Sequence, residues 1–279
     1  MNIVQLSDLN IKNKIYDGKR SSVYILEDGR ILKIYKRDYI ELLRKVGIDI
    51  EKKMADSFVT LTNDNIIKPS CLVYDKQEFV GDISMRAKGV DYGTFLESLN
   101  IEERTDLKLF ATLYSKLESI IRTSSNIAFP DICSYENIFI SNSGCNIELI
   151  DYEGFQVDNY PTLSFSRGLG DRQILMKSKK YTVEQGVTGK APLYTKELDI
   201  RSLIYFYFRS VFNIDLRYDR DIEVIARSIN SNNPDIMYKV WALFEEDVPN
   251  EWLGDDVFKI ATDYKLEILP NYRRRLKHK

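Results

Sequence analysis

The chain has 279 residues, of which 44% are apolar and 29% charged, a balance typical of a soluble globular protein. Its formal net charge of −2 gives no sign of a surface that binds nucleic acid. The single histidine, His278, is next to last, which excludes a Ser-His-Asp or Cys-His relay and an ordinary histidine-rich metal site in the body of the chain. Any catalysis must therefore depend on carboxylates, lysines or a metal held by oxygen ligands.

Cysteine usage and hydropathy favour the cytoplasm. The three cysteines, Cys71, Cys133 and Cys145, are too few for a four-thiolate metal site. Their odd number, without an apolar leader at the N-terminus, fits a reducing compartment. The longest apolar run, residues 203–208, falls far short of the roughly 20 residues that span a bilayer. The sequence therefore predicts a cytoplasmic protein without a membrane segment.

The first third of the chain predicts strands around one helical stretch. An Asp-Gly pair at residues 28–29 predicts a hairpin turn. Apolar residues recur at helical spacing over residues 37–58, with an interruption at Gly47 after which Asp49 can cap a second segment. The expected strands span residues 11–16, 22–26, 31–35, 71–74 and 78–85.

Beyond Gly89 the pattern becomes mainly helical. Two short strands interrupt it, over residues 138–140 and 147–150. The expected helices span residues 92–99, 101–122 and 198–212, the last of them buried. These elements predict an α+β, bilobal domain, with a small antiparallel β lobe over residues 1–88 and a larger, mainly helical lobe over residues 89–279. A cleft between two lobes is a common place for a ligand.

Residues in four places could carry chemistry. Gly18 and Val23 lie in a strand-turn-strand context, where glycine lets the backbone approach a phosphate. Lys33 lies between apolar residues of a strand and needs either a partner or solvent, and a carboxylate on the following helix would supply the partner. If the two later strands form a hairpin, Asn137 and Asp151 come together, and their oxygens are the ligands that Mg²⁺ prefers.

The loop that precedes Asn137 contains the fourth candidate, Asp131. Its carboxylate can accept a proton from a hydroxyl or orient that hydroxyl. The alternative interpretation is that Asp131, Asn137 and Asp151 are loop-end residues that cap turns.

The order of these elements resembles the protein-kinase fold. Gly18 with Val23 resembles the glycine-rich loop, and Lys33 resembles the strand lysine that holds the ATP phosphates. Glu51 matches the glutamate of the following helix that pairs with this lysine. Residues 85–89 resemble the hinge between the lobes. The resemblance implies that the nucleotide is bound by Gly18, Val23, Lys33, Glu51, Arg86 and Ala87.

The second half of the resemblance concerns the catalytic loop and the metal site. Residues 129–132, followed by Asn137, resemble the motif H-R-D-L-x-x-x-N. The segment 151–154, Asp-Tyr-Glu-Gly, resembles the D-F-G metal site. Asp199 resembles the aspartate of a buried helix that braces the catalytic loop. The resemblance extends from about Ile11 to Phe212.

The sequence also departs from the family pattern. Phe129 and Pro130 stand where the family has histidine and arginine, and the missing arginine argues against control by activation-loop phosphorylation. Six positions separate Asp131 from Asn137, where the motif has five. Aligning backward from Asn137 would place Ile132 at the base position. We prefer Asp131 with a one-residue bulge, because an apolar residue facing the substrate has no role.

The resemblance implies a phosphotransferase that uses ATP and Mg²⁺. Asp131 would orient the acceptor hydroxyl, Lys33 would hold the phosphates, and Asn137 and Asp151 would hold the metal. The expected acceptor is a serine or threonine of a protein, or the hydroxyl of a small molecule. The alternative is a pseudokinase that acts as a nucleotide-binding or inert interaction scaffold. No nucleic-acid or membrane partner is expected, and no pattern indicates an oligomeric state.

Overall fold

The computed structural model describes part of the chain. The described residues are 2–100, 103, 107–124, 126–129, 132, 134–141, 146–158, 160, 162, 199, 203, 206 and 210. The predicted catalytic residue Asp131, the two later cysteines and the lone histidine lie outside them.

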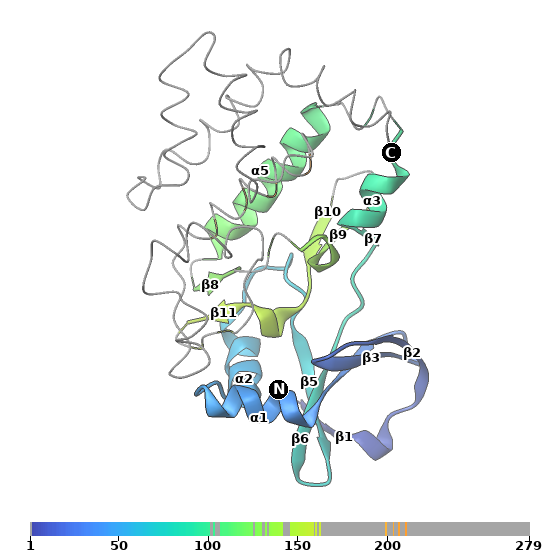
Figure 1. The fold of residues 1–279 in the computed structure, drawn as a ribbon, viewed down its shortest axis with the longest axis vertical. Helices are drawn as coiled ribbons and strands as arrows, with labels where there is room; N and C mark the ends of the chain where they lie inside the picture. The colour runs from blue at the N-terminus through green and yellow to red at the C-terminus, as the bar shows by residue number, and fades with distance from the viewer. Residues whose placement is uncertain are drawn as a thin grey trace.

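A six-stranded sheet forms the N-terminal part of the protein (Figure 1). Its strand order is β1-β5-β6-β4-β3-β2, and every neighbouring pair is antiparallel except β1 with β5. All five expected strands are present, and β1 is an addition that the sequence did not reveal. The strands are β1 (Asn2–Gln5), β2 (Ile11–Asp17), β3 (Ser21–Leu26), β4 (Ile31–Tyr35), β5 (Pro69–Asp75) and β6 (Glu78–Ser84).

Two helices follow β4, as expected. They are α1 (Arg37–Lys45) and α2 (Ile50–Thr60), and Gly47 separates them with a φ of +79°, a conformation that glycine adopts without penalty. The Asp49 side chain caps α2, because its Oδ1 accepts a hydrogen bond from the Lys52 amide at 3.0 Å. The predicted interruption and cap are both confirmed.

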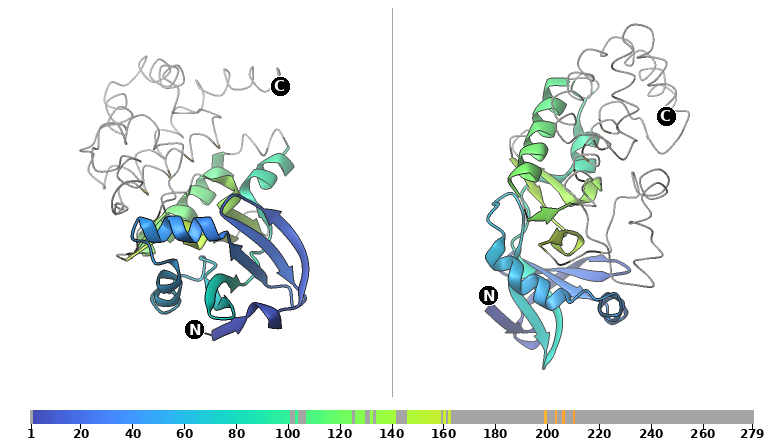
Figure 2. Two further views of the ribbon diagram at one scale, coloured as in Figure 1. Left: turned by 60° about the horizontal axis from the view of Figure 1, so that its bottom comes forward. Right: turned by 90° about the vertical axis from the view of Figure 1, so that its left-hand side faces the viewer.

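The remaining described elements surround a short hairpin. The hairpin strands β9 (Ile138–Ser141) and β10 (Asn146–Leu149) pair as predicted, and the two-residue strand β7 (Val90–Asp91) extends their sheet. The long helix α5 packs beside β10 (Figures 1 and 2). The other elements near it are α3 (Tyr92–Ser98), α5 (Leu107–Thr123), β8 (Ile127–Ala128), β11 (Gln156–Val157) and the 3₁₀ turns η2 (Tyr135–Asn137) and η3 (Tyr152–Gly154). A further 3₁₀ turn, η1 (Leu6–Asp8), follows β1 and contacts β5 of the six-stranded sheet.

Apolar side chains form one large core and one small one. The large core is continuous from Met54 of α2 through Leu117 of α5 to Leu149 of β10, so the sheet part and the helical part share it. The small core lies within the six-stranded sheet, where Val4 and Leu6 pack against it and so hold β1 in place. Its buried members are Leu26, Leu32, Cys71, Val73 and Ile83.

The described elements establish an α+β protein with a mostly antiparallel sheet. Of the expected buried helix over residues 198–212, four positions are described, Asp199, Leu203, Phe206 and Ser210, and all four are helical and buried. Within the described part of the chain, no helix is both long enough and apolar enough to cross a membrane.

Candidate functional site

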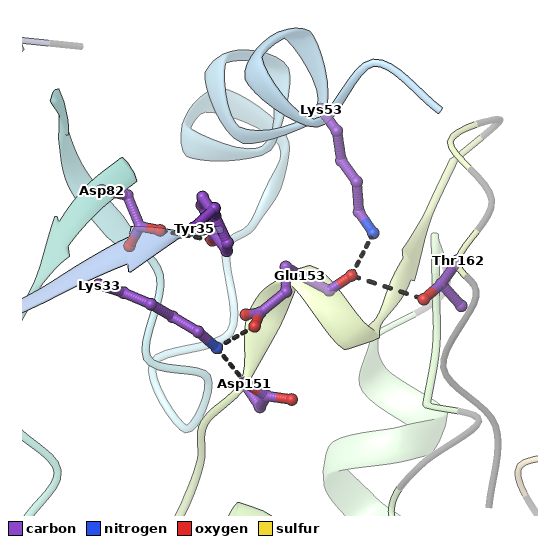
Figure 3. A network of polar contacts seen from close by, with 7 residues as sticks. All are labelled: Lys33, Tyr35, Lys53, Asp82, Asp151, Glu153 and Thr162. Atoms are coloured by element: carbon purple, nitrogen blue, oxygen red, sulfur yellow. Dashed lines mark hydrogen bonds and ion pairs between the residues drawn. The ribbon is translucent and has the colours of Figure 1, made fainter. Parts of the chain in front are cut away.

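Lys33 and Asp151 meet although 118 positions separate them (Figure 3). Lys33 lies on β4, between Val23 of β3 and Asp82 of β6 in the strand register. Its amino group donates hydrogen bonds to the Asp151 carboxylate and to the Glu153 carboxylate. We call Lys33, Asp151 and Glu153 the charge cluster. Lys33 thus has a partner rather than solvent, but both carboxylates come from the turn after β10 and not from the helix that follows β4.

The turn after β10 determines where Asp151 and Glu153 lie. Asp151 has a φ of +66°, in the left-handed region that aspartate tolerates better than most residues, and its carbonyl accepts from the Gly154 amide at 2.8 Å. Tyr152 is buried and packs edge-on against Phe155. The turn therefore anchors Tyr152 in the core while the carboxylates on either side of it reach Lys33.

Asn137 lies at the same end of the hairpin as Asp151. Ile138 pairs with Leu149 in the β9–β10 register, and the Ile150 amide donates to the Asn137 carbonyl at 3.0 Å. The prediction that the hairpin brings Asn137 and Asp151 together is confirmed. One amide and one carboxylate fit a Mg²⁺ ion that takes its other ligands from phosphates and water. Among the described residues, no group of three or more His, Cys, Asp or Glu side chains is arranged to hold a metal ion by itself.

Glu51 does not contact Lys33, so the predicted pair is wrong in this structure. The Tyr74 hydroxyl donates to the Glu51 carboxylate instead. Desolvation and this bond raise the pKa of Tyr74 to about 12. The reason is helical geometry: successive residues are about 100° apart around a helix, so Glu51 and Lys53 project in nearly opposite directions. Glu51 faces β5, and Lys53 faces the interior.

Lys53 is a site residue that the sequence analysis missed. Its side chain is only 1% exposed, and its amino group donates to the carbonyl oxygens of Glu153, at 2.8 Å, and Phe155. Burial lowers the pKa of Lys53 to about 7, and Asp151 opposes that shift. A sign of this role was present in the sequence, because Lys53 lies on the apolar stripe of its helix, three positions after Ile50.

A buried Tyr-Asp pair adjoins Lys33 and was also missed. The Tyr35 hydroxyl donates to the Asp82 carboxylate at 2.6 Å, and Asp82 stands opposite Lys33 in the β4–β6 register. Burial raises the pKa of Asp82 to about 6, although Tyr35 and Lys33 oppose the shift. Burial likewise raises the pKa of Tyr35. An aspartate in the middle of a predicted strand was the available signal.

The Gly18–Val23 segment forms the expected strand-turn-strand. The Gly18 amide donates to the Ser21 carbonyl at 2.9 Å and closes the turn between β2 and β3. The Asp17 carboxylate accepts from Lys36 at 2.8 Å and from Ser22 at 2.7 Å, and these bonds lower its pKa. Val23 is the register partner of Lys33, so the strand that leaves this turn borders the charge cluster.

The predicted hinge residues Arg86 and Ala87 connect β6 to β7 without regular structure. The far end of this connection is fixed to the hairpin. The Lys88 amide donates to the Glu148 carboxylate of β10 at 2.6 Å, and Val90 of β7 pairs with Ile140 of β9. The segment therefore joins the large sheet to the small one.

Asp199 braces the segment that leads toward Asp131. Its buried carboxylate accepts a hydrogen bond from the Phe129 amide at 2.6 Å, across 70 positions of sequence. The predicted brace is confirmed. Phe129, which stands where the motif H-R-D-L-x-x-x-N has histidine, is buried and packs edge-on against Phe155, with ring centroids 4.8 Å apart.

No protein-family model matches the sequence, and no curated protein is significantly similar to it. Function therefore has to be inferred from the geometry of the charge cluster and from the segments that surround it.

Proposed function

We propose that the chain is an ATP- and Mg²⁺-dependent phosphotransferase with a bilobal, protein-kinase-like fold. One observation carries the proposal: the strand lysine, Lys33, and the aspartate that follows the hairpin, Asp151, converge from distant parts of the sequence. In phosphotransfer of this type a lysine neutralises phosphate charge and an aspartate holds the metal, so the two must face one site.

Two further contacts support the proposal. Asn137 lies at the end of the hairpin beside Asp151, where it can supply the second metal ligand. Asp199 fixes the backbone of Phe129, two positions before Asp131. Asn137 and Asp199 both belong to motifs in which the sequence resembles the protein-kinase fold.

Each residue of the proposed site has a defined task. Lys33 binds phosphate oxygens, while Asn137 and Asp151 hold Mg²⁺, which neutralises phosphate charge when it is bound. Asp131 accepts the proton of the acceptor hydroxyl as the new oxygen–phosphorus bond forms and the bond from the γ-phosphorus to ADP breaks. The proposed acceptor is a serine or threonine of a protein, with a small-molecule hydroxyl as the alternative.

A pseudokinase is the second candidate, and one observation favours it. Lys33 already has two carboxylate partners, so an incoming phosphate must compete with both for the ammonium group. The substitutions of Phe129 and Pro130 for histidine and arginine point the same way. In this case the protein would bind nucleotide, or act through its surface alone, without transferring phosphate.

Phosphate transfer from ATP labelled at the γ-position separates the candidates. We expect transfer to the protein itself or to an added protein, detected by mass spectrometry. Asp151→Ala should reduce the rate by about a hundredfold or more, and Asp131→Ala should also reduce it strongly. Asp75→Ala removes an exposed carboxylate at the end of β5 and is the matched control.

If no phosphate transfer is detected, binding measurements distinguish the remaining possibilities. Mg-ATP that raises the melting temperature without any transfer would support the pseudokinase. A protein that neither binds Mg-ATP nor transfers phosphate would rule out both nucleotide-dependent functions.

A further inference from the structure

Lys33 has two carboxylate neighbours from a single turn, and their surroundings differ. The Asp151 side chain is 27% exposed, whereas that of Glu153 is 7% exposed. Figure 3 shows the two carboxylates reaching the Lys33 amino group from the same side. The more exposed carboxylate is the one to which the proposed function gives a metal. The more buried carboxylate has no task in that function.

A lysine that holds phosphate needs an anion that keeps it in place. If Asp151 turns to a metal ion, Lys33 loses one of its two partners and would be free to move. Glu153 does not have to leave, because it is not among the proposed metal ligands. An ammonium held by one remaining carboxylate keeps donors for phosphate oxygens, since it has three N–H groups.

The backbone of Glu153 is fixed by contacts outside the charge cluster. Lys53 donates to its carbonyl at 2.8 Å, and the Thr162 hydroxyl approaches the same oxygen at 3.5 Å. Lys53 comes from α2, so the helix acts on the carbonyl of Glu153 rather than on Lys33 directly. The side chain of Glu153 therefore extends from a position that is already set, which lowers the cost of orienting Lys33.

We propose that Glu153, and not Glu51, is the positioning residue that orients Lys33 for phosphate binding, and that Lys53 of α2 holds Glu153 in place. The proposal rests on the proposed function and deepens it. In the protein-kinase arrangement, the helix supplies a glutamate that pairs with the strand lysine. Here α2 supplies Lys53, which holds the backbone of Glu153, and the carboxylate of Glu153 pairs with Lys33.

The affinity for Mg-ATP, measured by titration calorimetry, tests the assignment. Glu153→Gln should weaken binding by about tenfold or more, the size of effect seen at metal sites when a partner that orients a ligand is lost. Glu51→Gln removes the charge of the competing candidate and should change affinity by about twofold at most, as expected for a partly exposed group outside the site. The reverse ranking of the two variants would overturn the assignment.

A double-mutant cycle distinguishes orientation of Lys33 from a general effect on folding. In a Lys33→Met background, Glu153→Gln should produce no further loss of Mg-ATP affinity, because there is no ammonium left to orient. Additive losses would overturn the proposal. Lys53→Met should weaken binding in the wild-type background and have no effect in the Lys33→Met background.

Two results distinguish a failure of this inference from a failure of the proposed function. If the wild-type protein binds Mg-ATP and Glu153→Gln binds it equally well, the inference fails and the proposed function stands. If the wild-type protein does not bind Mg-ATP, the proposed function fails, and the inference fails with it. Should Glu153→Gln not fold, Glu153→Asp keeps the charge but withdraws it by one methylene, and it should lose affinity while keeping the wild-type circular dichroism spectrum.

Discussion

The ionisable residues Lys53, Asp82 and Asp199 lie in the interior. Taking such groups out of water is destabilising unless each finds a hydrogen-bonding partner, and each of the three has one here. Interior groups of this kind concentrate at functional sites. Asp82 stands opposite Lys33, and Lys53 contacts the turn that carries Asp151, so two of the three adjoin the charge cluster.

Asp82 should make stability depend on pH in a defined direction. Its pKa is about 6 in the folded protein and about 3.8 as an isolated side chain. Between these values the folded state holds a proton that the unfolded state has released, so the free energy of unfolding falls as pH rises from about 4 to about 6. Above about 6 the loss is complete and amounts to at most about 3 kcal/mol.

Asp82→Asn should remove this dependence. The amide oxygen can still accept from Tyr35, but it has no proton to release. We therefore expect the stability of the variant, relative to wild type, to increase between pH 4 and pH 7, as measured by urea denaturation at each pH. Subtracting the wild-type curve cancels the contributions of the other titrating groups. Parallel curves for the two proteins would contradict the prediction.

The sequence identifies a site residue well where its type is unusual for its position in a strand. A lysine inside an apolar strand and an aspartate at the end of another identified Lys33 and Asp151. Glu51 matches the expected glutamate only by its place in the helix that follows Lys33, and that place does not say which face of the helix a residue occupies. Lys53 could have been identified from the apolar stripe, since it lies three positions after Ile50.

At the scale of the elements, hydrophobic periodicity predicted the helices and the longer strands, which contain enough residues to show a repeating pattern. The hairpin strands of the sheet, the break between α1 and α2 and the β9–β10 hairpin agree with expectation. The two-residue strands β7, β8 and β11 cannot show alternation. The strand β1 was missed for another reason: its parallel partner, β5, lies far along the chain, and local sequence carries no record of that pairing.

The connection that ends at β7 depends on a glycine. Gly89 has a φ of +86°, and a Cβ atom there would lie 2.0 Å from the Ile140 carbonyl oxygen of β9. Gly29, in the β3–β4 turn, has the same φ of +86° but nothing within 4 Å of the corresponding Cβ position. Substituting alanine at each position therefore separates backbone strain from steric overlap.

We expect Gly29→Ala to lower the free energy of unfolding by about 1–2 kcal/mol, the cost of a left-handed alanine. Gly89→Ala should cost about 1–3 kcal/mol more, because overlap with backbone atoms forces β7 and β9 apart. Chemical denaturation of both variants gives the two values. Equal destabilisation would show that the connection can shift away from β9 without loss.

At the scale of the whole molecule, contacts distant in sequence bring the site together. Lys33 meets Asp151 across 118 positions, Lys53 meets the Glu153 carbonyl across 100, and Phe129 meets Asp199 across 70. The order of the motifs can be read from the sequence, and their convergence on one site is what the resemblance to the kinase fold implies. Neither predicts that Glu153 takes the place of Glu51 beside Lys33, because that depends on which side chains α2 turns inward.

The contact between Phe129 and Asp199 predicts that Asp199 stabilises the segment that contains Phe129. Asp199→Ala deprives the Phe129 amide of a charged acceptor in the interior and should lower the free energy of unfolding by about 1.5–3 kcal/mol. Asp199→Asn keeps an acceptor oxygen of the same reach and should cost clearly less. Amide hydrogen exchange at Phe129, followed by mass spectrometry of the peptide that contains it, should accelerate in the alanine variant and much less in the asparagine variant. If both variants exchange as slowly as wild type, Asp199 does not brace this segment, and the position of the loop that leads to Asp131 must be set by other contacts.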